Sequence, residues 1–532
     1  MQLLENVIAW ASPEKALKRE HARRKLKILN SGYSQHGASY GKKALQGWIT
    51  SGRSADEDIC DNLETLRNRS RDLFMGTPIA TSALKTIRTG VVTSGLMLLP
   101  TPDFEFLGMT EEQAEKLRAD ILREWEMWAE TQDCDAARTC TFYQLQSLAL
   151  LSALMSGDVF VTMPLIPRKG SAYDLRVSLI EADRVCDPEP KPADKNIVEG
   201  VEIDKYGAPV AYHVAKNHPG ATPRTIKDVR QEWHRVPVFG AATGRRNVLH
   251  IMCDMERPGQ RRGVPLLAPV MEALKQLGRY TDAELMAAVV SGMFTVFIKS
   301  ETPETPLGGM FPDSMETDAD PNSYEMGNGA IVALGENESI DTANPGRPNT
   351  AFDGFVQSVC RQIGAALELP HEILLKEFNA SYSASRAALL EAFKVYKRIR
   401  EAFSANFCQP IYAEWLSEAV AKGRINAPGF FDDPAIKAAY CRADWIPDSH
   451  GQLDPLKEVN AAKVRVEEGF STREREAAEL TGMRFNSILA TRAREEEKRK
   501  AAGLIQESVP LTQESAGGED DDEVLESKNK QR

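Results

Sequence analysis

The chain has 532 residues, of which 42% are hydrophobic and 27% charged, with a formal net charge of −12. These values are typical of a folded protein of about two to four domains, and no stretch approaches the ~18 apolar residues of a membrane-spanning helix. The negative charge argues against tight, sequence-independent nucleic-acid binding by the chain as a whole, because that mode needs a basic surface. The eight cysteines form no CxxC pair, and we expect free thiols in a reducing compartment.

Residues 1–55 are polar and predict an N-terminal arm with little core of its own. Basic residues gather within it between Lys15 and Lys27. Two interpretations stay open. The first is a solvated helix face or mobile arm, which such charge runs usually form; the second is local contact with a polyanion.

Three helical patterns follow, at residues 56–93, 110–131 and 142–155. The first is broken at Thr77-Pro78, where Pro78 suits the first turn of a new helix. The third ends near Gly157, a residue that commonly terminates helices.

The pattern then changes to short β-branched segments bounded by turns, which predicts strands at 159–164, 175–180, 198–203, 210–214 and 248–252. Asp204-Lys205-Tyr206-Gly207 predicts a tight turn, and hence a hairpin, between two of them. His250 is interpreted as a structural rather than a catalytic histidine. Glu181 and Asp183 are interpreted as turn caps rather than an acid–base pair.

A loop at residues 256–263, broken by a Pro-Gly pair, leads into a long helical pattern. It predicts a helix over 264–293, about 45 Å long, with no catalytic constellation on it. The arrangement favours a structural strut. Its apolar stripe consists of Leu267, Val270, Leu274, Leu277, Leu285 and Val289.

Three arginines, Arg257, Arg261 and Arg262, surround the Pro-Gly turn. Their guanidiniums could pair with carboxylates within the chain or between subunits, and so support the base of the long helix. The alternative is direct contact with DNA phosphates.

An acidic, Pro/Gly-rich stretch at 301–329 lies between strand patterns at 294–298 and 331–334, which indicates an exposed inserted module. A helix is predicted at 352–367, then a polar loop at 377–383 and a second long helix at 384–421. Pro410 should kink this helix, and Ser383 or Ser385 could cap it. Residues 456–504 predict helices with a capping box beginning at Ser471, and the acidic sequence from Gln506 onward predicts disorder.

Enzymatic motifs are missing from the sequence: it contains no GxxxxGK[ST] phosphate loop, no GxGxxG after a strand, no HExxH and no GxSxG. The acidic run at 520–522 belongs to the tail, where no fixed geometry would hold a cation. We therefore expect no enzymatic activity, no cofactor and no metal site.

Short segments in a fixed order span about residues 55–500. They are RSRDLF (69–74), PIA (78–80), GVEID (200–204), Gly207, YHV (212–214), VLHI (248–251), ERPGQRRG (256–263), SYS (381–383), Ser385-Arg386 and DPLKE (454–458). In this order they resemble the portal proteins of tailed bacteriophages, specifically the lambda-like branch.

The resemblance implies an α+β portal-protein fold that assembles as a ring, with a mainly helical wing containing β-strands, a two-helix stem, a small α/β clip and a helical crown. The implied division is an N-terminal arm 1–55, wing 56–262, first stem helix 263–293, clip 294–350 and second stem helix 351–369. A tunnel loop 370–383, a long helix 384–421 joining wing and crown, a C-terminal wing and crown region 422–505 and a disordered acidic tail 506–532 complete it.

The same resemblance implies that about twelve copies form a closed ring at one capsid vertex, through which double-stranded DNA is packaged and ejected. The terminase large subunit and later a head–tail connector would dock on it, and scaffold and major capsid proteins would contact it. A negatively charged channel would let DNA slide. Assembly would occur in the host cytoplasm and the ring would remain in the virion.

Two groups of residues take roles by this resemblance. The tunnel loop would bring Lys376, Asn379, Tyr382 and Ser383 next to DNA. The three arginines of residues 256–263 would be joints at a subunit interface or at the base of the stem. Two other hypotheses stay open: an assembly factor absent from the finished particle, and a DNA-processing enzyme such as a nuclease or packaging ATPase.

Overall fold

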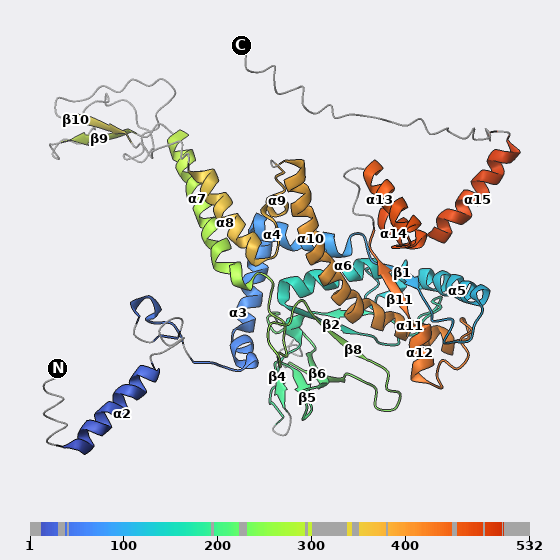
Figure 1. The fold of residues 1–532 in the computed structure, drawn as a ribbon, viewed down its shortest axis with the longest axis horizontal. Coiled ribbons are helices and arrows are strands. Elements are labelled where there is room, and N and C mark those ends of the chain that lie inside the picture. The colour runs from blue at the N-terminus through green and yellow to red at the C-terminus, as the bar shows by residue number, and fades with distance from the viewer. Residues whose placement is uncertain are drawn as a thin grey trace, which may run out of the picture. The chain divides into compact units, whose positions relative to one another are not determined.

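The computed structural model describes residues 12–29, 38–39, 42–49, 51–192, 196–222, 231–292, 296–300, 338–342, 351–378, 381–448, 455–481, 485–502 and 504. The chain divides into two compact units, residues 1–61 and 62–532, and each is described by itself. In the first unit, a 3₁₀ turn (Lys43–Leu45) follows helix α2 (Pro13–Leu29) (Figure 1). Every side chain of α2 that the structure describes is exposed.

The first helices of the larger unit form where the sequence predicts them. Pro78 opens a helix at a position where its missing N–H is not needed. The hydroxyls of Thr110 and Thr141 each accept the backbone N–H of the glutamine three residues later, and the side-chain oxygen of that glutamine accepts the N–H of the threonine. These capping boxes fix the starts of two further helices. Gly157, with a φ of 91°, ends the last helix. The bounds are α3 (Ala55–Gly76), α4 (Pro78–Val92), α5 (Glu111–Ala129) and α6 (Phe142–Ser156).

Two antiparallel sheets carry most of the strands, in the orders β3-β2-β8 and β4-β5-β6-β7. The predicted strand at 198–203 is split, because Glu199 and Gly200 both have positive φ. The predicted hairpin is confirmed: the Asp204 carboxylate accepts the N–H groups of Tyr206 and Ala208 at 2.8 and 2.9 Å. The bounds are β2 (Asp158–Thr162), β3 (Ser178–Ile180), β4 (Ile197–Val198), β5 (Val201–Ile203), β6 (Pro209–Ala215), β7 (Trp233–Pro237) and β8 (Val248–Met252).

A small apolar core joins the two sheets. The ring of Phe160 on β2 stacks on His250 of β8 with centroids 4.2 Å apart and meets Tyr212 of β6 edge-on at 5.0 Å. β7 was not predicted, because its central residues are polar and exposed and give no apolar alternation.

An aromatic cluster links the first and last parts of this unit. The ring centroid of Trp125 on α5 lies 5.1 Å from that of Phe142 on α6 and 5.0 Å from that of Trp415 on α11 (Gln409–Ala421). It also meets Trp445 of β11 (Ala443–Ile446), the strand that pairs antiparallel with β1 (Met97–Pro100). Helix α12 (Pro434–Tyr440) precedes β11. Neither four-residue strand was predicted, since each is too short to establish a period.

The long helix predicted over 264–293 is shorter than expected. A 3₁₀ turn (Ala268–Val270) precedes α7 (Met271–Gly292), whose 22 residues correspond to about 33 Å. Pro265 and Pro269 explain the late start, because neither has an N–H for a helical hydrogen bond. Helix α8 (Phe352–Ala366) runs beside α7 (Figure 1). The ring centroid of Tyr280 on α7 lies 5.6 Å from that of Phe352 and 4.9 Å from that of Phe355.

Strands β9 (Val296–Ser300) and β10 (Glu338–Thr342) pair antiparallel between these two helices in the sequence. β9 overlaps the strand predicted at 294–298. The strand predicted at 331–334 and the acidic stretch at 301–329 lie outside the residues that the structure describes.

The second long helix is interrupted near Pro410, as predicted. α10 (Tyr382–Phe403) passes through a π-helical turn (Ser404–Cys408) into α11, where Pro410 occupies the first turn. The wider turn accommodates a residue that cannot donate a backbone hydrogen bond. The predicted caps are wrong: Ser381, not Ser383 or Ser385, accepts the N–H of Ala384 at 3.4 Å.

Three helices end the described chain: α13 (Pro455–Glu467), α14 (Arg473–Thr481) and α15 (Phe485–Ala501). The capping box predicted at Ser471 is wrong by one residue, because the Thr472 hydroxyl accepts the N–H of Arg475 at 3.2 Å. Arg465 and Glu476 join α13 to α14 through bonds of 2.8 and 2.6 Å.

All eight cysteines are free thiols, as expected. In the parts of the chain that the structure describes, no helix combines the length and apolarity needed to cross a membrane. The predicted tail at 506–532 lies outside those parts.

Candidate functional site at the base of the α7–α8 hairpin

A buried carboxylate, that of Asp158 at the start of β2, joins four segments of the chain. It accepts bonds from Arg67 of α3 at 3.0 Å, from Arg262 at 2.8 and 3.2 Å, from His250 of β8 at 3.0 Å and from the N–H of Gly263 at 3.0 Å. Burial alone would raise the pKa of Asp158, but the charges of Arg262 and Arg67 hold it well below its ordinary value. The aspartate is therefore charged wherever the chain is folded near neutral pH.

Arg262 is completely buried, and its hydrogen bonds occupy all five donors of its guanidinium. Besides Asp158 it reaches the carbonyl oxygens of Val185 and Glu199, both at 2.7 Å, and of Ala182 at 2.8 Å. The plane of the guanidinium lies over the Phe160 ring, 5.0 Å from its centroid. One side chain thus fixes the loop before α7 to β2 and to two connecting loops.

Of the alternatives for Arg262, the intrachain ion pair is the one that the structure contains. A role in contacting DNA or a neighbouring subunit is wrong for this residue, because a completely buried guanidinium is inaccessible to either. Arg261 donates to the side-chain oxygen of Asn196 at 3.3 Å, and Arg257 is exposed on the Pro-Gly turn. Gln260 closes that turn by accepting the N–H of Arg257 at 3.3 Å.

The backbone of this loop touches the backbone at the end of α6. A Cβ atom built on Gly263 would collide with the carbonyl oxygen of Gly157, and one on Gly157 would collide with that of Gly263. Two backbone hydrogen bonds flank this contact: the N–H of Cys253 donates to the carbonyl oxygen of Gly157 at 3.3 Å, and the N–H of Leu266 donates to that of Leu154 at 3.0 Å. Two glycines are therefore required for the chain to enter α7 in this direction.

The α7–α8 pair is buried at its base and exposed at its far end. Leu274 and Leu277 of α7 belong to the main core together with Cys360 and Ile363 of α8. The last two residues of the predicted stripe face solvent, with 64% of Leu285 and 43% of Val289 exposed. Met286 beside them and Phe355 of α8 are exposed as well. The predicted apolar stripe is therefore buried at its first four residues and exposed at its last two.

Arg398 on α10 bonds to both chain segments at the base of this pair. It bonds to Asp254, before α7, at 3.3 Å and to Glu368, after α8, at 2.6 Å. All three side chains are about half exposed, so each ion pair contributes at most about 1 kcal/mol. These two ion pairs position α10 against the base of the hairpin rather than adding much stability.

The segment predicted as a loop at 370–383 contains a short helix, α9 (His371–Leu375). Lys376 ends it in the left-handed conformation with a φ of 58°, and its side chain is exposed. Asn379 lies outside the described residues, Tyr382 is the first residue of α10 and Ser383 is exposed in its first turn.

Both ends of this segment are held on α4. The Ser82 hydroxyl donates to the Leu374 carbonyl at 3.0 Å. Arg400 of α10 donates to the carbonyls of Gly90 and Val91, both at 2.8 Å, at the C-terminal end of α4. Burial lowers the pKa of Arg400 to about 10. Residues 376–381 therefore connect two fixed helices.

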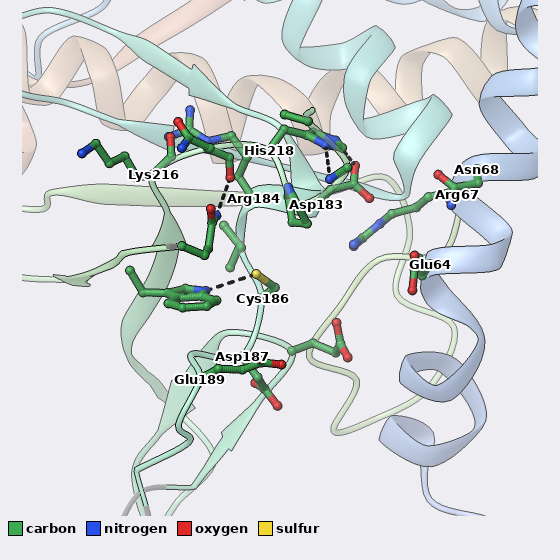
Figure 2. A pocket seen from close by; sticks show the side chains of 18 of the residues that line it. Glu64, Arg67, Asn68, Asp183, Arg184, Cys186, Asp187, Glu189, Lys216 and His218 are labelled. Carbon is green, nitrogen blue, oxygen red and sulfur yellow. Dashed lines mark hydrogen bonds and ion pairs between the residues drawn. The ribbon is translucent and has the colours of Figure 1, made fainter. Parts of the chain in front are cut away.

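A hollow of about 840 Å³ lies beside the Asp158 cluster, between α3 and the loop that follows β3 (Figure 2). Asp183 on its wall pairs with Arg71 and lies 3.8 Å from His218, so it serves as an ion-pair partner. Glu181 precedes a 3₁₀ turn (Ala182–Arg184) without capping it, and the turn-cap interpretation of these carboxylates is wrong. Cys186 accepts a bond from the Trp233 indole at 3.3 Å, and burial raises the pKa of its thiol, which makes it less nucleophilic.

Among the described residues, no group of three His, Cys, Asp or Glu side chains is placed to hold a metal ion. The polar groups described so far bond chiefly to one another and to backbone carbonyls. The ion pairs and hydrogen bonds around Asp158 and Arg262 therefore hold helices, strands and loops in fixed positions relative to each other.

A family model, that of the phage portal proteins of the lambda family, matches residues 41–400. The chain belongs to this family. It is 25% identical to portal protein B of Escherichia phage lambda over 502 residues, which cover 89% of this chain and 91% of that protein. It is 26% identical to the portal protein of Escherichia phage N15 over 496 residues, with the same coverage.

Solved structures with some likeness to this portal chain come from gene transfer agent (GTA) particles. The neck of a native particle, computed with C12 symmetry, has a TM-score of 0.38 at 13% identity and covers 78% of this chain and 92% of that one. The neck of an empty particle, computed with C6 symmetry, has a TM-score of 0.40 at 14% identity, covering 83% and 96%. TM-scores this low add nothing to the assignment, which rests on the family match.

Sequence reasoning missed the centre of this site in the portal chain. Asp158 directly precedes the apolar run Val159-Phe160-Val161, and Arg67 sits four residues after Leu63 on the apolar face of α3. A charge on an otherwise apolar face is the available signal of a buried ion pair, because an unpaired charge there would be too costly.

We predict that Asp158→Asn destabilises the portal chain by about 3–5 kcal/mol, because it leaves Arg67 and Arg262 buried without a countercharge. Asp174→Asn is the matched control, since its pair with Lys422 is partly exposed and contributes at most about 1 kcal/mol. Urea unfolding followed by circular dichroism measures both. Equal destabilisation by the two substitutions would contradict the role assigned to Asp158.

Replacing Gly263 with valine should separate the loop before α7 from Gly157, because the new Cβ has no space. We expect a lower unfolding temperature and impaired ring assembly, measured by thermal denaturation and negative-stain microscopy. Gly76→Ala is the control, as a Cβ there meets nothing within 4 Å. Normal rings with valine at position 263 would refute this.

We predict that the free energy of unfolding decreases as the pH falls, because His250 is held neutral in the folded chain. Burial lowers the pKa of this imidazole, and Arg262 and Arg67 add to the effect, so it stays neutral in the folded chain and donates Nε2–H to the Asp158 carboxylate. The unfolded chain takes up a proton near the ordinary value of 6.5, and stability is therefore lost as pH falls below it. The loss is at most about 1.4 kcal/mol per pH unit.

His250→Gln removes the titrating group and keeps a donor, so its stability should fall less between pH 7.5 and 5.5 than that of the native chain. All other side chains are the same in the two proteins, so their contributions cancel in the comparison. Parallel pH profiles in urea unfolding would show that His250 makes no contribution.

Proposed function

We propose that copies of this chain form a closed ring of about twelve subunits at one capsid vertex, and that double-stranded DNA passes through its channel during packaging and ejection. The observation that carries the proposal is the apolar far end of α7. Leu285 and Val289 face water in a single chain although they continue a core-forming stripe, and Met286 beside them is also exposed. In a ring, the neighbouring subunit would cover them, and each Å² of apolar surface so removed contributes about 25 cal/mol.

The proposed parts follow the family resemblance. Residues 56–262 would form the wing, α7 and α8 the stem, residues 294–350 the clip and residues 370–383 the tunnel loop. The helix over 384–421 would join the wing to a crown within residues 422–505. Support comes from the firm attachment of the hairpin at its base, which lets its far end project as a wall.

The charges of the proposed wall suit a conduit. Helix α7 carries three acidic and two basic residues, and α8 carries one of each. Such a surface does not attract phosphates strongly, so DNA could move along it with little dependence on salt. A basic wall would instead bind the duplex.

The segment between α9 and α10 is the proposed DNA-facing loop. Lys376 and Ser383 are exposed, and the helices on either side are fixed to α4. Lys376 would meet phosphates as it passes them, with Asn379, Tyr382 and Ser383 beside it. Arg257 and Arg261 would lie near a subunit joint at the base of the stem.

The proposed partners are those of the family resemblance. The terminase large subunit and later the head–tail adaptor would dock on the clip, and the scaffold and major capsid proteins would surround the wing during assembly in the host cytoplasm. The ring would stay in the finished virion. Absence of the chain from purified virions would favour an assembly factor instead.

The test is a double substitution, Leu285→Asp with Val289→Asp. Both residues are largely exposed in the single chain, so the unfolding temperature should change little while rings are lost. Tyr206→Asp, at the exposed hairpin tip, is the control and should leave rings intact. Negative-stain microscopy and light scattering report the assembly; unaffected rings in the double variant, or a native chain that stays monomeric at high concentration, would contradict the proposal.

A further inference from the structure

One strongly basic helix stands out in this acidic chain. Helix α2 carries seven basic and two acidic residues, although the whole chain has a net charge of −12. At an ionic strength of about 0.1 M, charges more than about 10 Å away are largely screened. The local charge of α2 therefore decides what it attracts. Its basic residues are Lys15, Lys18, Arg19, Arg23, Arg24, Lys25 and Lys27.

The cations have a regular arrangement on the helix. Lys15, Arg19 and Arg23 follow one another at four-residue steps, so they form one ridge with a rise of about 6 Å per step. Lys18 and Lys25 lie on the adjoining side of the same half of the helix. All five side chains are exposed. Together they present an array of positive charge about 15 Å long.

The two acidic residues of α2 leave it with a net charge of +5, because the helix has seven basic residues. Glu14 and Glu20 lie outside the arc that the five cations occupy. The ion pair between Glu14 and Lys18 is 3.6 Å long and almost fully exposed, a kind of pair that contributes little. A phosphate can therefore replace the carboxylate at low cost.

The apolar residues of α2 do not gather on one wide face. Positions 17 and 28 lie on one side of the helix and positions 22, 26 and 29 on the other, so each side carries only a short apolar strip. Leu17 is 63% exposed. Docking into a protein groove or onto a lipid surface needs an aligned apolar face. The positive charges of α2 are instead spaced along a line, and such a line is complementary to the row of negative phosphates in a nucleic-acid backbone.

We propose that α2 binds double-stranded DNA through its phosphates and without sequence preference. The contact would be additional to any made inside the channel and does not depend on ring formation. Its affinity should fall steeply with salt, since each neutralised phosphate releases about 0.9 of a counterion.

The test is binding of a fluorescent duplex of about 30 base pairs to the full-length chain, measured by anisotropy at several salt concentrations. Substituting Lys15→Gln, Arg19→Gln and Arg23→Gln together should weaken binding at least tenfold near 0.1 M salt and reduce the salt slope by about 2–3. Glutamine maintains helix propensity, so the helix should persist.

The matched control removes the same charge elsewhere, by Lys116→Gln, Arg123→Gln and Lys169→Gln at exposed positions. It should bind DNA like the native chain. The proposal is overturned if the two triple variants lose affinity equally, if the α2 variant binds normally, or if poly-glutamate binds the native chain more tightly than DNA, which would identify an acidic protein as the partner.

Discussion

A single buried negative charge fixes the geometry of this chain. Asp158 is removed from water and can stay ionised only because Arg67 and Arg262 lie against it, with His250 and the N–H of Gly263 completing its hydrogen bonds. These partners come from α3, the loop before α7 and β8. The three segments must therefore meet β2 at one point before the ion cluster becomes favourable, and the direction in which the chain enters α7 is set there.

The α7–α8 hairpin then has two ends with different physical character. Its base is held by buried charge, by the contact between two glycines and by a core that includes Leu274 and Ile363. Its far end leaves apolar side chains in water. Intrachain contacts thus account for the base, and the proposed ring assigns the far end to contacts between subunits. Arg398 links the base of the hairpin to α10, and so to the proposed DNA-facing loop.

Local chemistry made much of the secondary structure predictable. Pro78, the threonine–glutamine capping boxes and the Asp204 turn act within about four residues, so their effect can be read from neighbours in the sequence. Errors arose where two neighbours offered similar caps, as Ser471 and Thr472 do, or where prolines delayed the start of α7. The four-residue strands β1 and β11 were not predicted, because each forms only by pairing with the other, far away in the sequence.

The candidate site was less predictable than the fold. The sequence drew attention to Arg262 but gave no partner for it, since Asp158 lies 104 residues earlier. The sequence also did not show which part of the apolar stripe leading into α7 is buried and which part is exposed. Periodicity shows that apolar residues share one face of a helix, but it does not show what packs against that face. The family resemblance, by contrast, was carried by short segments in order and is confirmed by the family match.

A cryo-EM reconstruction of the assembled particle would show how neighbouring subunits meet. We expect a closed ring in which α7 and α8 of every subunit line the channel, Leu285 and Val289 are covered by a neighbouring subunit, and Asp158 pairs with Arg262 of its own chain. Hairpins that point away from the axis, or an α7 face left open to solvent, would contradict it.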